Sequence, residues 1–242
     1  MANLKRFFVD TIEDTTYLVG EEFEHAKNVL RLGVGAEIIL LDNSGLEYTG
    51  VIASVDKKQM AVNIVRKEVG TREAERDVCL LFGYLKNADK NEFIVQKAVE
   101  LGVKAIGVFS SEYSSAFMNA NKLERLNKVA KEASKQCLRS TAPQVVYYEN
   151  LEQALSSAKE RSVKLFACEF AQESEKNLRE ITETEGSVAI VIGSEGGCSK
   201  QEATLAKELG FSHITLGKRI LRAETAAVAL TSIVMFSLGE MD

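Results

Sequence analysis

Two glycine-bearing segments near the end of the chain carry residue types that could do chemistry. The first glycine loop, residues 193–199, reads Gly-Ser-Glu-Gly-Gly-Cys-Ser and follows an apolar run. Its glycines permit close approach of a ligand to the backbone, and Ser199 with Glu202 has the spacing of a helix capping box. The loop has neither the G-x-x-x-x-G-K-S/T motif nor the G-x-G-x-x-G motif of phosphate-binding loops. It also places the anionic Glu195 where a phosphate would bind. It favours a ligand with cationic or hydrogen-bond-donating groups, with an unliganded strand-to-helix turn as the alternative.

The second glycine loop, residues 217–225, reads Gly-Lys-Arg-Ile-Leu-Arg-Ala-Glu-Thr. It carries three cations and precedes an uncharged segment, residues 226–238, that is predicted to be helical. A helix that is apolar all round is buried, either in the core or against a partner chain. Cations packed beside a buried helix indicate either a functional role or a structural network. The network would pair Lys218, Arg219 and Arg222 with Glu195, Glu202 or Glu224.

Six apolar runs separated by helical segments must position these loops. Such alternation predicts an α/β fold with a mostly parallel sheet, in which ligands bind beyond the carboxyl ends of the strands. The loops that follow the strands are therefore where a site is expected. The predicted strands are residues 79–84, 105–109, 145–147, 163–168, 187–192 and 213–216.

The chain before residue 67 has a different pattern, with short β segments and turn residues between them. A small β-barrel-like domain is the simplest interpretation. The charged stretch 68–77 indicates a solvated connection, so we expect domains at residues 1–70 and 71–242. The predicted strands are residues 6–9, 16–19, 36–42, 46–55 and 60–66, with one helix at 21–30.

The net charge of the 242 residues is −5, which at first argues against a nucleic-acid partner. Basic residues nevertheless outnumber acidic ones in residues 71–150. There, a helix with a buried stripe at Leu123, Leu126, Ala130, Ala133 and Cys137 would carry basic residues on its opposite side. This side is predicted to be a cationic face, with an ordinary solvated surface as the alternative. The predicted face consists of Arg125, Lys128, Lys131, Lys135 and Arg139.

Composition also bears on compartment and cofactor. No apolar signal segment follows the first ten residues, and the longest uncharged stretch, 225–239, is too short to span a membrane. The four cysteines are scattered without a C-x-x-C pair, and there are two histidines. We therefore expect a soluble, cytoplasmic protein without a membrane partner, a metal site or a disulfide framework.

With these motifs the chain resembles the RsmE family of 16S rRNA uridine-N3 methyltransferases, within the knotted SPOUT superfamily. The most specific matches are residues 192–197 and 216–226. Two positions depart from the family pattern. Ser194 stands where proline is common, which should loosen the loop, and Tyr113 stands where many members have arginine. Further matches are Arg6-Phe7-Phe8, His25 with Val29-Leu30-Arg31, Gln96-Lys97-Ala98, Glu100-Leu101-Gly102-Val103, and Glu132-Ala133 with Gln136 and Arg139.

The resemblance implies a PUA-like or OB-like RNA-binding barrel at the N-terminus and a SPOUT α/β domain with a deep trefoil knot. It also implies a homodimer that uses S-adenosylmethionine (SAM) to methylate N3 of a uridine in 16S rRNA within the small ribosomal subunit. Two alternatives remain. One is a SPOUT methyltransferase acting on another rRNA or tRNA position. The other is a non-catalytic RNA-binding factor in ribosome assembly.

The implied reaction assigns roles to individual residues. Arg222 would stabilise the anionic uracil, and Glu195 or Glu224 would be the protein base, although Glu224 could instead stabilise a helix start. The implied cofactor contacts are Leu165, Gly193, Glu195, Gly196, Gly197, Leu216, Gly217, Ile220, Leu221 and Arg222. The implied RNA contacts are Arg6, His25, Lys27, Arg31, Lys97, Arg125, Lys128, Lys135 and Arg139.

Overall fold

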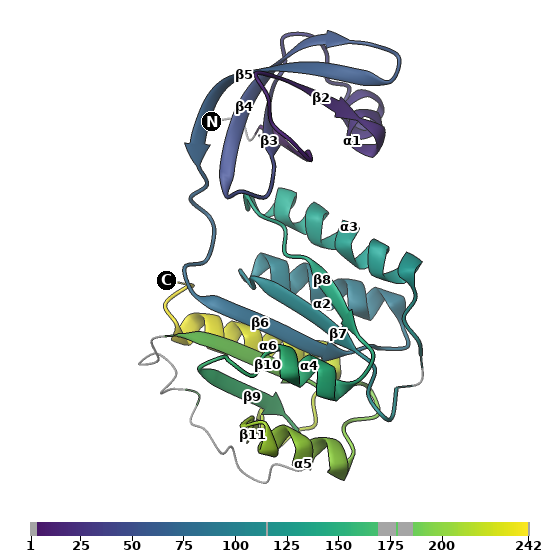
Figure 1. Cartoon of the computed structure of the whole chain (residues 1–242), viewed down its shortest axis with the longest axis vertical. Coiled ribbons are helices and arrows are strands. Elements are labelled where there is room, and N and C mark those ends of the chain that lie inside the picture. The colour runs from purple at the N-terminus through teal and green to yellow at the C-terminus, as the bar shows by residue number, and fades with distance from the viewer. Residues whose placement is uncertain (1–3, 115, 169–177, 179–185, 242) are drawn as a thin grey trace. The chain divides into compact units, whose positions relative to one another are not determined.

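The computed structural model describes residues 4–114, 116–168, 178 and 186–241. The chain forms two compact units (Figure 1). The first consists of residues 1–73 and 134–142, and the second consists of residues 74–133 and 143–242. No pattern in the sequence indicates that residues 134–142 belong with the first unit.

The first unit is built on a five-stranded sheet in the order β1-β3-β4-β5-β2. β1 runs parallel to β3, and the other neighbours are antiparallel. Phe7, Leu18, Ile38 and Leu40 are fully buried on the inner face, as alternation of apolar and polar residues predicts. The strands are β1 (Lys5–Phe8), β2 (Thr15–Val19), β3 (Glu37–Leu41), β4 (Leu46–Val55) and β5 (Gln59–Val69), and the helical segments are α1 (Gly20–Glu24) and the π-helical η1 (His25–Val29).

The solvated connection expected at residues 68–77 is shorter than predicted, and none of these residues is buried. β5 continues to Val69, and the next strand begins at Asp77. Between them, the Glu73 carboxylate accepts hydrogen bonds from the Arg139 guanidinium and from the backbone N–H of Ser140 and Thr141. Partial burial opposes ionisation of Glu73, but the Arg139 charge and these hydrogen bonds outweigh burial and lower its pKa.

The second unit contains a six-stranded sheet in the order β11-β9-β10-β6-β7-β8, and every pair of neighbours is parallel. The prediction of a parallel α/β sheet is therefore confirmed. The strands are β6 (Asp77–Gly83), β7 (Ala105–Phe109), β8 (Val145–Tyr148), β9 (Val163–Ala167), β10 (Ser187–Ile192) and β11 (Ser212–Ile214). The helices are α2 (Ala88–Glu100), α3 (Ala120–Gln136), α4 (Leu151–Ser157), α5 (Lys200–Glu208) and α6 (Ala223–Ser237).

Strand composition explains why this sheet lies inside the unit. Residues 188–192 of β10 are all buried, and β10 is hydrogen-bonded to β6 on one side and to β9 on the other. A strand buried on both faces reads as a continuous apolar run, which is the pattern in the sequence. Because the strands are parallel, their carboxyl ends lie at one edge, so the loops after β6, β7, β10 and β11 gather there. The trefoil knot stays a prediction.

α6 differs from the sequence expectation. It begins at Ala223 and not at residue 226, so its first turn includes the carboxylate of Glu224. The helix is therefore not free of charge, and the last three residues of the second glycine loop belong to it. α6 packs against α2, β6 and β10 through residues such as Ala227, Leu230 and Val234. Ile233 and Phe236 stay exposed on it.

Candidate active site

The first glycine loop is a turn between β10 and α5 that is held by its own hydrogen bonds. The predicted capping box is confirmed: Ser199 accepts a hydrogen bond from the backbone N–H of Glu202, and the Glu202 carboxylate accepts one from the backbone N–H of Ser199. Gly197 has φ +73°, in the region that favours glycine, and its N–H donates to the carbonyl of Ser194. The loop is thus closed on itself before any ligand is considered.

Neighbouring loops hold the first glycine loop in place. The Ser111 hydroxyl, after β7, donates to the buried hydroxyl of Ser194 over 2.8 Å. A Cβ on Gly83, at the end of β6, would lie 2.5 Å from the backbone nitrogen of Ser194. A Cβ on Gly196 would lie 2.7 Å from the Cβ of Tyr113. The effect of serine in place of proline at position 194 stays a prediction, but the Ser194 hydroxyl gives the loop a contact with the segment after β7 that proline could not make.

Glu195 of the first glycine loop is bound at both carboxylate oxygens. One oxygen accepts from the backbone N–H of Lys86 at 3.0 Å, and the other accepts from the Lys90 ammonium at 3.1 Å. The Lys86 N–H, followed by Lys90, lowers the pKa of Glu195 against a smaller opposing effect of burial. Lys90 also lies 3.5 Å from Glu224. One ammonium therefore joins the two carboxylates that were predicted to serve the site.

Sequence reasoning missed Lys86 and Lys90. The available signal was positional, because both residues come just after β6, and the loops that follow parallel strands are where a site is expected. The strand itself was predicted, but the loop after it carries no glycine signature that would draw attention to it.

The second glycine loop is open. Gly217 has φ +101°, and no atom lies within 4 Å of where its Cβ would be. Ile220 is 98% exposed, and Leu216 and Leu221 are half-buried. Arg222 is exposed at the residue before α6 and makes no side-chain cap. An apolar side chain left in water is the kind of surface that an adenine ring would cover.

The three cations of this loop do not form the structural network that was the alternative. Lys218, Arg219 and Arg222 are exposed and make no ion pair with any residue that the structure describes. The carboxylates that could have paired with them are engaged elsewhere. Glu195 and Glu224 contact Lys90, and Glu202 binds the backbone N–H groups of Ser199 and Glu112.

The predicted cofactor contacts, with one exception, surround the carboxyl edge of the sheet. Residues 193–197 follow β10, and residues 216–222 follow β11, which is separated from β10 only by β9. Leu165 is the exception, because it lies inside β9 and is fully buried. The chain fits a SAM-like ligand in three respects: the exposed Ile220, the open backbone at Gly217, and a buried oxygen of Glu224 without a hydrogen-bond partner among the described residues.

The predicted cationic face on α3 is wrong in part. The stripe is buried at Leu126, Ala130 and Ala133, as expected. Lys135, however, is mostly buried and paired with Glu22, and Arg139 is buried and paired with Glu73. α3 ends at Gln136, and Leu138 has φ +67°, so a helical spacing cannot be extended to Arg139. Lys128, Lys131 and Arg125 stay exposed, with Lys128 paired with Glu124 and Arg125 paired with Glu92.

The remaining predicted RNA contacts differ in availability. Arg6 forms a two-point ion pair with Glu47, in which its side chain is 8% exposed. His25 packs edge-on against Phe7, and Lys27 lies over the ring of Phe23. Arg31 is exposed, and Lys97 is paired with Glu100. Arg6, Lys135 and Arg139 are each held in an ion pair within the protein, and the RNA contacts themselves stay predictions.

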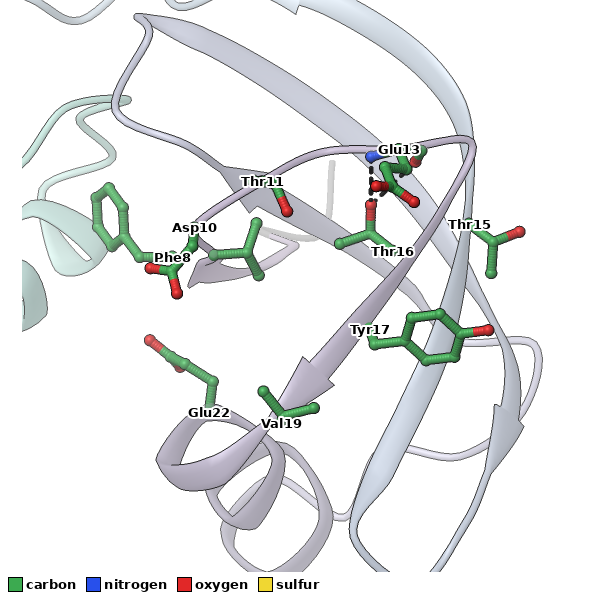
Figure 2. Close-up of a pocket in the computed structure, with 10 residues that line it drawn as sticks. Phe8, Asp10, Thr11, Glu13, Thr15, Thr16, Tyr17, Val19 and Glu22 are labelled. Atoms are coloured by element: carbon green, nitrogen blue, oxygen red, sulfur yellow. Dashed lines mark hydrogen bonds between the residues drawn. The ribbon is translucent and has the colours of Figure 1, made fainter.

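The first unit has a pocket of about 370 Å³ near β2 (Figure 2). Its lining includes three carboxylates, those of Asp10, Glu13 and Glu22, beside the apolar surfaces of Phe8 and Tyr17. The described residues that line it include no lysine or arginine, so the charge of the lining does not favour a phosphate. We do not assign it to the site.

Two further properties concern metals and membranes. Within the described residues, no group of three or more histidine, cysteine, aspartate or glutamate side chains is arranged to hold a metal ion. None of the helices in the described ranges combines the length and apolarity that a membrane crossing requires.

Known proteins show where the chain belongs. An RNA methyltransferase domain family matches residues 72–235, and an RNA methyltransferase PUA domain family matches residues 18–65. A ribosomal RNA small subunit methyltransferase E from Bacillus subtilis is 30% identical over 96% of both chains. One from Mesomycoplasma hyopneumoniae is 38% identical over 69% of this chain and 73% of its own.

Solved structures agree with these matches. A ribosomal RNA small subunit methyltransferase E from Neisseria gonorrhoeae, bound to SAM, superposes with a TM-score of 0.84 at 29% identity and covers 96% of this chain and 97% of its own. A methyltransferase from Legionella pneumophila in complex with SAM gives 0.87 at 27% identity, covering 97% and 98%. The fold is therefore an α/β RNA methyltransferase domain that follows a PUA-like domain in the chain. The chain belongs to the ribosomal RNA small subunit methyltransferase E family.

Proposed function

We propose that the protein transfers a methyl group from SAM to N3 of a uridine in 16S rRNA of the small ribosomal subunit. The observation that carries this proposal is the meeting of two glycine loops of opposite character at one edge of a parallel sheet. One is closed and anionic, and the other is open, apolar and cationic. We propose residues 1–70 as an RNA-binding domain and residues 71–242 as the methyltransferase domain, in a cytoplasmic protein.

The cofactor contacts follow from the loop geometry. SAM supplies an electrophilic methyl group on a sulfonium. Backbone groups of Gly193, Gly196, Gly197, Leu216 and Gly217 would hold it, and Ile220 and Leu221 would cover its apolar part. Binding there removes the exposed apolar surface of Ile220 from water, which is favourable. The carboxylate of Glu195 would lie at the cationic end of the ligand.

Arg222 is the residue that would act on uracil. Uridine N3 must lose its proton before it can attack, so the site has to favour an anionic ring. Arg222 is exposed, lies directly before α6 and makes no ion pair with a described residue. Its guanidinium stays charged and offers several fixed donors to the uracil oxygens. Lys218 and Arg219 on the same loop would contact the RNA backbone.

We assign the proton acceptor to Glu224 in preference to Glu195. Both oxygens of Glu195 are engaged by Lys86 and Lys90, and its lowered pKa makes it a weaker base. Glu224 has one oxygen without a hydrogen-bond partner among the described residues, so an incoming N–H donor would satisfy it. The assignment places the base two residues after Arg222.

We also propose that two copies of the chain assemble through α6. Ile233 is 39% exposed and Phe236 is 64% exposed, and they lie three residues apart on one side of the helix. A second copy would bury this apolar surface in a two-fold interface. Light scattering after size exclusion tests the dimer, and a monomeric mass for the intact protein would contradict it.

The reaction is tested by incubating the protein with unmodified small subunits and labelled SAM, followed by nucleoside mass spectrometry. We expect 3-methyluridine in 16S rRNA. Arg222→Ala should bind SAM with near-normal affinity and lose most turnover, whereas Arg222→Lys should keep part of it. Label in tRNA, or at another rRNA position, would replace the uridine-N3 assignment. Failure to bind SAM in a calorimetric titration would favour a non-catalytic RNA-binding factor.

A further inference from the structure

Lys90 joins parts of the second unit that are far apart in sequence. It lies in the first turn of α2, and its ammonium is 3.1 Å from Glu195 and 3.5 Å from Glu224. Glu195 belongs to the first glycine loop, and Glu224 belongs to the first turn of α6. A single side chain therefore contacts the carboxylates of both glycine loops.

The support beneath Lys90 is rigid. Asn91, the next residue, is buried, and its amide donates to the carbonyls of Leu85 and Asn87 while its oxygen accepts from the backbone N–H of Leu85. These bonds fix the turn between β6 and α2. The same turn presents the N–H of Lys86 to Glu195. Lys90 thus starts from a fixed backbone, which reduces the conformational entropy lost in making its two contacts.

The ion pair between Lys90 and Glu224 differs from an ordinary surface ion pair because Glu224 is largely buried. The Glu224 side chain is 16% exposed, and its second oxygen is buried without a hydrogen-bond partner among the described residues. Lys90 is the cation that the structure places against it. A carboxylate this deeply placed becomes unfavourable when its cation is removed, so the first turn of α6 depends on Lys90.

The two carboxylates differ in how much they rely on this lysine. Glu195 keeps the N–H of Lys86 if Lys90 is lost, and its loop keeps the hydrogen bond from Ser111 to Ser194. Glu224 keeps no second partner among the described residues. Loss of Lys90 should therefore leave the first glycine loop in place and release the start of α6, with Arg222 directly before it.

We propose that Lys90 is a positioning residue that sets the start of α6, and with it Arg222, against the first glycine loop. This inference rests on the proposed methyl transfer for its effect on turnover, but its structural part does not depend on that function. Within the described chain, Lys90 forms ion pairs with Glu195 and Glu224. It acts through Glu224 and Glu195.

The structural part is tested without substrate by hydrogen–deuterium exchange of the intact protein. In Lys90→Met, amides of residues 217–228 should exchange at least threefold faster, while those of residues 193–199 should change little. Lys90→Arg should restore slow exchange, because a guanidinium can also pair with both carboxylates. Glu224→Gln breaks the same contact from the other end and should give the same local increase. Lys159→Met, which removes an exposed pair with Glu160, is the matched control and should not alter exchange.

The functional part is tested by separating SAM affinity from turnover. Lys90→Met should change the SAM dissociation constant by less than about threefold and lower kcat by at least tenfold, with recovery in Lys90→Arg. Slow exchange at residues 217–228 in Lys90→Met, or no recovery of slow exchange in Lys90→Arg, would overturn the proposal. If the wild-type protein fails to methylate but the exchange pattern holds, the proposed function is wrong and the positioning role stands.

Discussion

The two glycine loops follow strands of the same sheet and both begin with a glycine, yet they differ in which of their polar groups have partners within the protein. In the first, the Ser194 hydroxyl and both Glu195 oxygens have partners within the protein. In the second, Ile220 and Arg222 extend into solvent. The polar side chains of the first loop have partners without a ligand, whereas the second loop exposes apolar and charged side chains to solvent.

This difference indicates that the two loops have different roles in ligand binding. A loop that is already ordered loses little conformational entropy when a ligand binds, so it can fix the position of that ligand. An open loop supplies the groups whose burial and charge pairing come only from the ligand. Substitutions at Gly83, Ser111 and Glu195 test whether the first loop is held as tightly as its contacts imply. A substitution at Ile220 tests whether the second loop is left open for a ligand.

Gly83→Ala should have the largest effect. Its new Cβ would lie 2.5 Å from the backbone nitrogen of Ser194, and the backbone of a closed loop has little room to move. We expect a loss of about 3 kcal/mol in the free energy of unfolding, at the upper end of overpacking costs. Chemical denaturation measures it.

Gly33→Ala is the matched control, because no atom lies within 4 Å of its Cβ and its φ is not positive. It should be neutral or slightly stabilising. If Gly83→Ala is equally neutral, the first glycine loop is not clamped, and the contrast between the loops fails.

Ser111→Ala should have the next largest effect. It removes the donor to Ser194 and leaves a buried hydroxyl without that partner. We expect a loss of about 1–2 kcal/mol in the free energy of unfolding. The double variant Ser111→Ala with Ser194→Ala removes both partners and should recover part of this loss. Strict additivity of the two single effects would show that the hydrogen bond does not anchor the loop.

Much of the fold could be predicted from the sequence. Apolar runs at residues 105–109 and 187–192 predicted their strands to the residue, because strands buried on both faces leave an uninterrupted signal. α6 was predicted three residues too late, since the charged residue in its first turn read as part of a loop. Elements that depend on distant contacts were missed. Glu73 lies in a polar stretch, and only the folded chain brings Arg139 to it.

The positions of the loops that form the candidate site could be predicted from the sequence, but the contacts of their side chains could not. Glycine spacing located both loops, because tight turns require particular residues at fixed positions. The partner of Glu195 could not be inferred, since Lys90 lies more than 100 residues earlier and no local pattern links them. Helical spacing also misplaced Arg139, because Leu138 turns the chain out of the helix. Charge pairing, unlike periodicity, is a property of the tertiary structure.

Lowering the pH should have a smaller effect, by weakening the contacts that Glu195 makes in the first glycine loop. The Lys86 N–H and Lys90 lower the pKa of Glu195 below its ordinary value of 4.5. Because the folded-state pKa is the lower one, the stabilisation is complete above the unfolded pKa and is lost as pH falls through the folded pKa. The Tm difference between wild type and Glu195→Gln should therefore shrink below about pH 4.5. Glu160→Gln, at a carboxylate 90% exposed, is the control and should show no such change.

Ile220→Ala should have the smallest effect on stability and a clear one on binding. The side chain is 98% exposed, so its truncation should change the free energy of unfolding by no more than about 0.5 kcal/mol. If SAM covers this residue, the lost apolar burial should weaken binding about tenfold, equivalent to about 1.4 kcal/mol. Val34→Ala, at an exposed valine of the first unit, should alter neither quantity. A stable Ile220→Ala that binds SAM as tightly as wild type would mean that the open loop is not completed by the cofactor, and its cations and apolar side chain would then have to be assigned to RNA.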